Sequence, residues 1–348
     1  MVRHAILVAL MIAGPPATAG EIPANTWVEL TPRDCTGSLC SGKPPEWRGY
    51  SGSSIGNGYI WWWGGGHKAG PTNDIDAYNI SENRWEQFTT AEDIRDTPEW
   101  DHLTAEQKEK QLNTWGGGRG PMYWSPLGRF MTHHSYSWQL WHPVRAEWCG
   151  LFPYPPKQYP VLACYDPAKG DESGDPAASG TDPTQPDGAF TIVSRNVPDW
   201  KTARHTAGLI WDPKREQLVM TIKARGNAGV WRYHAETDQW KRVAGDLVKG
   251  NKYSEGYIEY HPGLDAYFTV RRRQMNLVNA ETGESTSIRN PPTGLLTFSL
   301  EYSPELDRML FGGTHNGLAH VYAYDPERDH WHHLDLKGAV PADSTLGY

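Results

Sequence analysis

The chain has 348 residues, of which 38% are hydrophobic, 12% aromatic and 21% charged. This composition is typical of a folded globular protein and excludes a disordered chain. The formal net charge is −8, and because an acidic chain repels phosphate backbones, we expect no nucleic-acid partner.

The first twenty residues have the organisation of a secretory signal peptide. Arg3 precedes the apolar run AILVALMIAG, and residues 17–19 form the A-x-A pattern of a cleavage site. We therefore predict cleavage near Ala19 and a periplasmic or extracellular location for residues 21–348. No other stretch approaches the roughly 20 apolar residues that a membrane helix needs, so we expect no membrane span.

The chain contains four cysteines. An even number in an exported chain predicts disulfides. The local pairings are Cys35 with Cys40 and Cys149 with Cys164, although other connectivities remain open. No C-x-x-C pattern is present to favour zinc.

Three segments share one spacing, in which a tyrosine is followed seven residues later by a tryptophan. They are AYNISENRWEQF (Tyr78, Trp85), RYHAETDQWKRV (Tyr233, Trp240) and AYDPERDHWHHL (Tyr324, Trp331). Polar turn formers lie between the two aromatic residues. The pattern predicts two strands joined by a tight turn, with both aromatic side chains on one buried face.

A second pattern recurs and reads as apolar strand, turn, apolar strand. It occurs as LWHPVRAEWCG (140–150), IWDPKREQLVM (210–220), EYHPGLDAYFT (259–269) and EYSPELDRMLF (301–311). Together the two patterns make a four-stranded unit of about 40 to 50 residues, the period of a propeller blade. Five blades are visible, at roughly 48–88, 121–200, 202–243, 252–290 and 295–335. With NTWVEL (25–30) as an outer strand, the two termini could supply part of a sixth or seventh blade.

A pair of glycines ends one strand at residues 64–65 and again at 312–313. With the later tyrosine and tryptophan, this resembles the kelch-type β-propeller, the superfamily that includes galactose oxidase. The resemblance covers most of residues 45–335 and implies an all-β, kelch-like β-propeller of four-stranded blades, but it says little about function. The second blade departs from the pattern because no tryptophan follows Tyr165, and the fourth because LVNAETGESTSI replaces both aromatic residues.

The stretch YIWWWGGG places three tryptophans, Trp61 to Trp63, directly before three glycines. We expect the indole rings to fill the wedge between neighbouring blades or the rim, and the glycines to let backbones approach where the sheets converge.

Two insertions interrupt the single propeller domain, at residues 89–120 and 168–188. In the first, Thr104 and Gln107 form a capping box that predicts a short helix. The second is acidic and rich in glycine and proline. Its residues Asp171, Asp175 and Asp182 could bind calcium, but the EF-hand spacing is absent and we favour a solvated loop. We therefore assign no metal site and no cofactor.

The first strand of each propeller blade begins near the central channel, so residues at these positions converge. The corresponding segments are MTHHSYSW (His133, His134), TARHTAGLIW (Arg204, His205) and KYSEGYIEY (Tyr253, Tyr257). The loops after the paired glycines add His67 and His315, and VRRRQ adds Arg271. Imidazole is a general acid or base near neutral pH, and guanidinium binds carboxylates.

This residue set resembles the site of the propeller-fold polysaccharide lyases, including ulvan lyases. The resemblance implies removal of the proton α to a uronate carboxylate by histidine or tyrosine, with positive charge stabilising the enolate. We predict as catalytic His134, His205, Tyr253 and Tyr257. We predict as substrate-binding His67, His133, Arg204, Arg271 and His315, with Trp115 and Trp124 as off-repeat aromatic platforms for sugar rings.

Each of these histidines has a structural alternative, a hydrogen bond to the backbone of a neighbouring blade. Four other histidines are expected to face solvent: His142 and His261, which precede prolines in turns, and His332 and His333, which follow Trp331.

We therefore predict an exported monomer acting on an acidic poly- or oligosaccharide, most concretely as a lyase. The first alternative is a non-catalytic propeller that binds glycan or protein. A copper radical oxidase resembling galactose oxidase is a further alternative, but it needs a cysteine free to crosslink to a tyrosine. A sugar epimerase or mutarotase would use a similar acid–base set.

Overall fold

The structure is a computed structural model. It describes residues 52–63, 74–82, 84–89, 101–108, 137–154, 159–170, 189–198, 208–222, 229–245, 256–271, 274–292, 298–315 and 318–337. In these ranges the chain is almost entirely β-strand, with two 3-10 turns, η2 (Pro167–Lys169) and η3 (Ala235–Thr237), and a short helix.

The strands form five four-stranded antiparallel sheets, and neighbouring strands in each sheet are consecutive in the chain. We number the sheets as blades 1 to 5. Blade 1 contains β1 (Ser53–Gly56), β2 (Tyr59–Trp62), β3 (Asp76–Asn79) and β4 (Arg84–Gln87). Blade 2 contains β5 (Gln139–His142), β6 (Glu147–Tyr154), β7 (Tyr159–Tyr165) and β8 (Phe190–Ser194). Blade 3 contains β9 (Gly208–Asp212), β10 (Gln217–Ile222), β11 (Gly229–His234) and β12 (Gln239–Ala244). Blade 4 contains β13 (Gly256–His261), β14 (Ala266–Arg271), β15 (Gln274–Asn279) and β16 (Ser285–Ile288). Blade 5 contains β17 (Phe298–Ser303), β18 (Arg308–His315), β19 (Leu318–Asp325) and β20 (His330–Leu334).

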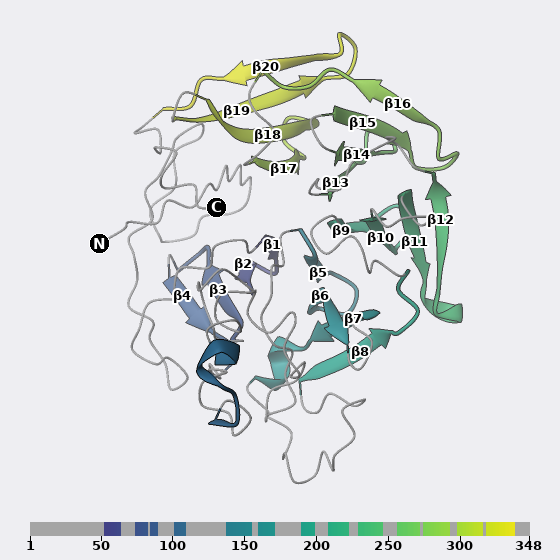
Figure 1. Cartoon of the computed structure of the whole chain (residues 1–348). Coiled ribbons are helices and arrows are strands. Elements are labelled where there is room, and N and C mark those ends of the chain that lie inside the picture. Colours follow the sequence, from purple (N-terminus) through teal and green to yellow (C-terminus); the bar gives the residue numbers. More distant parts are fainter. Residues whose placement is uncertain are drawn as a thin grey trace.

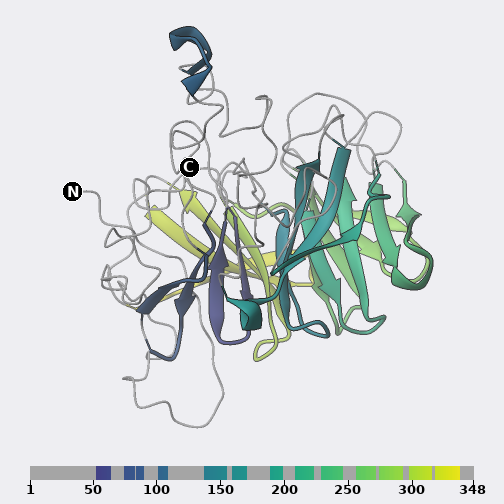
Figure 2. The same cartoon turned by 90° about the horizontal axis from the view of Figure 1, so that it is seen from below.

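The blades are arranged around a common axis as a β-propeller, with the first strand of each blade nearest the centre (Figure 1). The first strands of consecutive blades contact one another from β1 to β17. Blades 2 and 3 are also joined by a bridge between Ser137 and Gly208, next to which Leu209 N donates to Ser137 O at 2.8 Å. Figure 2 shows the blades standing side by side. The prediction of five four-stranded blades is confirmed, whereas the termini proposed for further blades lie outside the described residues.

The spacing of tyrosine and tryptophan is explained by the strand register. In blades 1, 3 and 5 the two residues face each other directly across the outer pair of strands, as Tyr78 and Trp85, Tyr233 and Trp240, and Tyr324 and Trp331. Their ring centroids are 5.1 to 5.4 Å apart. In blade 2 the residue opposite Tyr165 is Phe190, which lies beyond the insertion. The aromatic pair is therefore kept where the sequence pattern is interrupted.

Four turns are closed by one recurring hydrogen bond, from a tyrosine hydroxyl to the carboxylate of the aspartate five residues later. The pairs are Tyr233–Asp238 at 3.1 Å, Tyr260–Asp265 at 2.9 Å, Tyr302–Asp307 at 2.8 Å and Tyr324–Asp329 at 2.7 Å. Each of these aspartates has φ of 47 or 48°, a left-handed conformation that aspartate tolerates better than most residues. The Tyr-x4-Asp pattern therefore stabilises the conformation of these four turns.

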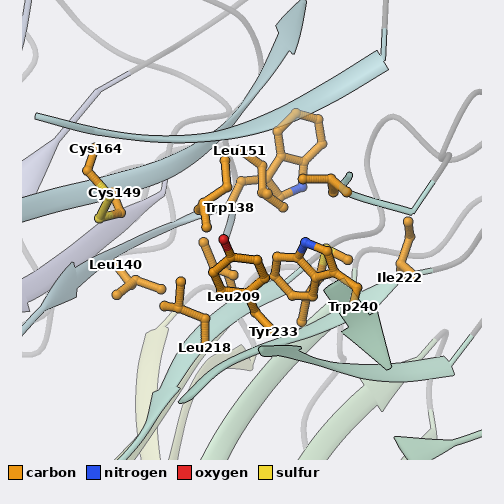
Figure 3. Close-up of a cluster of buried hydrophobic side chains, with 13 residues drawn as sticks. Trp138, Leu140, Cys149, Leu151, Cys164, Leu209, Leu218, Ile222, Tyr233 and Trp240 are labelled. Atoms are coloured by element: carbon orange, nitrogen blue, oxygen red, sulfur yellow. A yellow bond between two sulfur atoms is a disulfide. The ribbon is translucent and has the colours of Figure 1, made fainter. Parts of the chain in front are cut away.

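The core lies between the blades. One apolar cluster joins blades 2 and 3 and includes Leu140, Leu151, Leu209 and Leu218 beside the Tyr233–Trp240 pair (Figure 3). Equivalent clusters lie between blades 1 and 2, 3 and 4, and 4 and 5. Blades 2, 3 and 4 therefore contribute both of their faces to packing, which is how a propeller of narrow blades buries its surface.

Two tryptophans of the YIWWWGGG stretch, Trp61 and Trp63, fill the wedge between blades 1 and 2, as predicted. Trp61 is fully buried and stacks on Trp141 of β5, with ring centroids 5.3 Å apart and an interplanar angle of 12°. Trp63 is also buried and meets Phe152 of β6 edge-on at 4.7 Å. Trp62 is half-buried on the other face. The three glycines that follow lie outside the described residues.

The predicted disulfide between Cys149 and Cys164 is present, and both residues are buried. They face each other across β6 and β7. Neither described cysteine is free. The predicted pair of Cys35 and Cys40 lies outside the described residues.

The capping box in the first insertion is also confirmed. Thr104 N donates to Gln107 Oε1 at 2.8 Å, and Gln107 N donates to Thr104 Oγ1 at 3.2 Å, at the start of helical residues 105–108. The second insertion leaves the blade after η2, and its three aspartates lie outside the described residues.

Candidate functional site

Most of the side chains predicted to form the site lie outside the described residues. These are His67, Trp115, Trp124, His133, His134, Arg204, His205 and Tyr253. Whether the predicted histidines converge is therefore still a prediction.

Three predicted residues lie on described strands. Arg271 ends β14 and pairs with Gly256, the first residue of β13, while His315 ends β18 close to the start of β17. Both backbones are therefore at the rim where the first strands begin, which is the predicted level. Tyr257 is the second residue of β13; its half-buried side chain packs into the cluster between blades 4 and 5.

The sequence prediction missed two glutamates whose charges interact. Glu259 is on the first strand of blade 4 and Glu301 on the first strand of blade 5. Each stands three residues before the proline of its turn. Blades 2 and 3 have Leu140 and Ile210 at that position, both buried against the following blade. Glu259 therefore occupies, half-buried, a position where blades 2 and 3 have a core residue, and Glu301 occupies the equivalent position of blade 5 with its side chain exposed.

The side chain of Glu259 lies at the edge of the sheet that faces the axis. Its Oε1 atom accepts a hydrogen bond of 3.1 Å from Tyr260 N. The first strand of a blade is hydrogen-bonded to another strand of the blade on one side only. A backbone N–H of this strand that donates to a side chain therefore points to the other side, towards the central axis. Glu259 is half-buried, whereas Glu301 is exposed to solvent. By strand alternation, Tyr257 and Glu259 lie on the same face, about 7 Å apart along β13.

The protein surroundings raise the pKa of both carboxyl groups. Although its side chain keeps contact with solvent, desolvation by the surrounding protein raises the pKa of Glu301 to about 7. Desolvation also raises the pKa of Glu259 well above its ordinary value, and the negative charge of Glu301 raises it further, while the hydrogen bond from Tyr260 N opposes the shift. A carboxyl group with a pKa of about 7, as for Glu301, can both donate and accept a proton near neutral pH, which is the property needed for general acid–base catalysis.

A second polar cluster lies where the first strands of blades 3 and 4 end and is structural. The fully buried Asp212 accepts hydrogen bonds from Arg215 at 3.1 Å and from the Tyr267 hydroxyl at 2.6 Å. Arg215 also donates to Asp265 at 2.7 and 2.9 Å, and these bonds lower the pKa of Asp265. The charges of blades 3 and 4 neutralise one another here, so the cluster joins two blades.

The expectation that His142 and His261 face solvent is wrong. Only 8% of His142 and 2% of His261 is exposed. Each Nδ1 atom accepts a backbone hydrogen bond inside its turn, from Arg145 N at 3.4 Å and from Leu264 N at 3.3 Å. Burial lowers the pKa of both imidazoles, that of His142 to about 4. The two rings are therefore neutral parts of the core, whereas His332 and His333 are exposed as expected.

No family model matches the chain, and the search of curated proteins found no match. Among solved structures, the chain is similar to the crystal structure of TolB from Acinetobacter baumannii, with a TM-score of 0.48 and 10% sequence identity. The similarity covers 87% of this chain and 57% of that structure. In the described part of the chain, no helix is sufficiently long and apolar to cross a membrane.

Proposed function

We propose that the protein is an exported, kelch-like propeller that acts on carbohydrate, with Glu259 and Glu301 as members of its acid–base site. The observation that carries the proposal is the replacement of core residues by two carboxyl groups on adjacent first strands, both with raised pKa values. Partial burial of the Glu259 charge, where other blades have an apolar side chain, destabilises the fold, so its presence calls for a functional reason.

The most concrete reaction is lyase cleavage of a uronate-containing polysaccharide. Removal of the proton α to the carboxylate needs a base, for which Tyr257, Tyr253, His134 and His205 are the proposed residues. Protonation of the leaving oxygen needs an acid, and a carboxyl group with a pKa of about 7 is half protonated at neutral pH. In its neutral form Glu301 can donate a hydrogen bond to an anionic sugar instead of repelling it.

Export is supported by the Cys149–Cys164 disulfide, since such bonds persist in oxidising compartments and are rare in the cytosol. The same disulfide removes two cysteines from the set that a copper radical oxidase could crosslink to tyrosine. We propose that the chain is a monomer and requires no cofactor.

The test is an activity assay of the purified full chain against a panel of acidic and neutral polysaccharides. A lyase produces unsaturated ends that absorb ultraviolet light, a hydrolase produces reducing ends without that absorbance, and an epimerase changes the sugar without cleaving it. Glu301→Gln and Glu259→Gln should each lower kcat by at least about 100-fold, as expected for loss of a general acid or base. Glu327→Gln, on the exposed turn after β19, is the matched control.

The pH profile provides a second readout. If Glu301 acts as the acid, kcat/KM should fall as pH rises through about 7, and this limb should be absent in Glu301→Gln. Sugar binding without turnover on the whole panel would overturn the enzyme proposal in favour of a non-catalytic glycan-binding propeller. Full activity of both glutamine variants would remove these residues from the site.

A further inference from the structure

The two outer strands of blade 5 present four histidines, and two of them meet. His320 is on β19 and His333 on β20. The Nδ1 atom of His320 lies 3.0 Å from the Nε2 atom of His333, and the ring centroids are 5.2 Å apart. Both side chains are accessible, His320 in part and His333 more fully.

The other ring nitrogen of His333 is held by a carboxylate. His333 Nδ1 lies 3.0 Å from Asp335 Oδ1, so it donates a hydrogen bond and leaves Nε2 with its lone pair directed at His320. A histidine that ligates a metal almost always donates its second N–H to such an acceptor, which fixes the tautomer and makes the ligating nitrogen more basic.

A third contact fixes the orientation of the pair. The ring of Tyr322, which is 7% exposed, meets the His333 ring edge-on at 5.2 Å and lies 6.3 Å from the His320 ring. Tyr322 and His333 are directly opposite in the strand register. The two imidazoles therefore stand over a rigid aromatic floor, not on a loop.

The remaining two histidines belong to the other face of β20. Strand alternation places His330 and His332 together, and their ring centroids are 4.9 Å apart. His332 Nε2 is 3.5 Å from Asp325 Oδ2. These residues share the strand and the residue type with His333 but not its partners, so they provide a matched control.

We propose that His320 Nδ1 and His333 Nε2 form a surface site for a borderline divalent transition-metal ion of the Zn²⁺, Cu²⁺ or Ni²⁺ class. Two nitrogens bound to one tetrahedral ion at about 2.05 Å are separated by about 3.3 Å, only a few tenths of an ångström more than the observed distance. Asp335 positions His333 without binding the ion. Water completes the coordination, so the site is open to a further ligand.

Loading the site requires one change of tautomer. In the metal-free protein, His320 Nδ1 carries the proton that it shares with His333 Nε2, because the other nitrogen of His333 already donates to Asp335. Binding of the ion at Nδ1 requires the tautomer of His320 that carries its proton on Nε2, and in this tautomer the imidazole stays neutral. Both ligating nitrogens then direct lone pairs at the ion.

The experiment is a titration of the full chain, purified without a histidine tag, with Zn²⁺ alone. Heat of binding gives the affinity, and the ring resonances of labelled histidines report which imidazoles bind. We expect the rings of His320 and His333 to shift together. We also expect His320→Ala and His333→Ala to abolish this binding step, and Asp335→Asn to weaken it by about 10- to 100-fold. The His330→Ala/His332→Ala variant should bind as the wild type does.

Thermal unfolding of each variant provides the folding control, and these accessible positions should change the midpoint little. The proposal is overturned if the His320 and His333 rings do not respond to Zn²⁺, or if His320→Ala binds as tightly as the wild type. It is also overturned if only the His330→Ala/His332→Ala variant loses binding.

Discussion

The disulfide between Cys149 and Cys164 offers the most direct quantitative test of the structure. Its two cysteines are 15 residues apart. In the chain-entropy description, a cross-link that closes a loop of this size lowers the entropy of the unfolded chain enough to stabilise the fold by about 3 kcal/mol. Both cysteines are buried in blade 2, so Cys149→Ala/Cys164→Ala also loses the packing of two sulfur atoms. We therefore expect a loss of at least about 3 kcal/mol.

The measurement is unfolding of the oxidised wild type and of the double variant, followed by circular dichroism in urea and on heating. For a chain of 348 residues, about 3 kcal/mol corresponds to a decrease in Tm of about 4 °C. Wild type that is first unfolded and reduced, and then refolded with reductant present, should resemble the variant. A loss below about 1 kcal/mol, or equal midpoints for oxidised and reduced wild type, would refute the cross-link or its assigned role.

Three further predictions concern the polar and tightly packed contacts. Arg215→Ala leaves the buried Asp212 without its cation and should lower the free energy of unfolding in urea by about 3 to 5 kcal/mol. The control is Arg328→Ala, in an exposed turn where Arg328 lies 3.8 Å from Asp325, and it should cost less than about 1 kcal/mol. Equal costs would contradict the structural role of the buried cluster. Gly56→Ala should destabilise the protein by about 1 to 3 kcal/mol, because the new Cβ would lie 2.0 Å from Trp141 Cγ and the stack on Trp61 holds that ring in place. The control is Gly245→Ala, where the nearest atom is the flexible end of Arg242 at 3.4 Å. An equal loss of stability in the two variants would contradict the packing described for Trp141. The pKa of Glu301 is higher in the folded chain, about 7 against 4.5, so the folded state binds more protons than the unfolded state. The free energy of unfolding should therefore decrease as pH rises from about 4.5 to 7. Glu301→Gln should flatten this dependence and be more stable than the wild type at pH 8, and an unchanged dependence would show that the pKa of Glu301 is not raised.

The sequence predicted the fold well because each blade repeats a local signal. Tyr78 and Trp85 fall directly opposite each other across a tight turn, and a contact between residues seven apart is visible in any linear reading. The same locality made the disulfide and the capping box predictable, as each involves strands or turns that are neighbours in the chain.

The histidine predictions show where local reading failed. His142 and His261 precede prolines in polar turns, which ordinarily indicates exposure. Both rings instead close their own turns through Nδ1 and pack against the next blade, His142 on Trp211 at 4.5 Å and His261 on Tyr302 at 4.9 Å. Contacts with a neighbouring blade depend on how the blades pack around the axis, so they cannot be predicted from the sequence of the turn alone.

The two glutamates were missed for a different reason, although their signal was present in the sequence. EYHPGLD and EYSPELD match residue for residue except at two positions, and that match identified them as repeat elements. Alignment with LWHPVRA and IWDPKRE instead shows a charge in two blades where the other two have a core residue. The position of the glutamates is therefore recognised by comparing all four segments for differences. A search for similar segments alone does not reveal it.

That difference also limits what the position can be for. A leucine or isoleucine at Glu259 would extend the apolar cluster between blades 4 and 5, as Ile210 extends the one between blades 3 and 4. Burying a carboxyl there instead costs free energy, and the raised pKa is the measure of that cost. A purely structural role would require a cation or a set of donors to offset it, as Arg215 offsets the charge of Asp212. Within the described residues, the donor to the Glu259 carboxylate is Tyr260 N–H, and this sparse pairing is the reason that we propose an acid–base role for Glu259 and not a structural one.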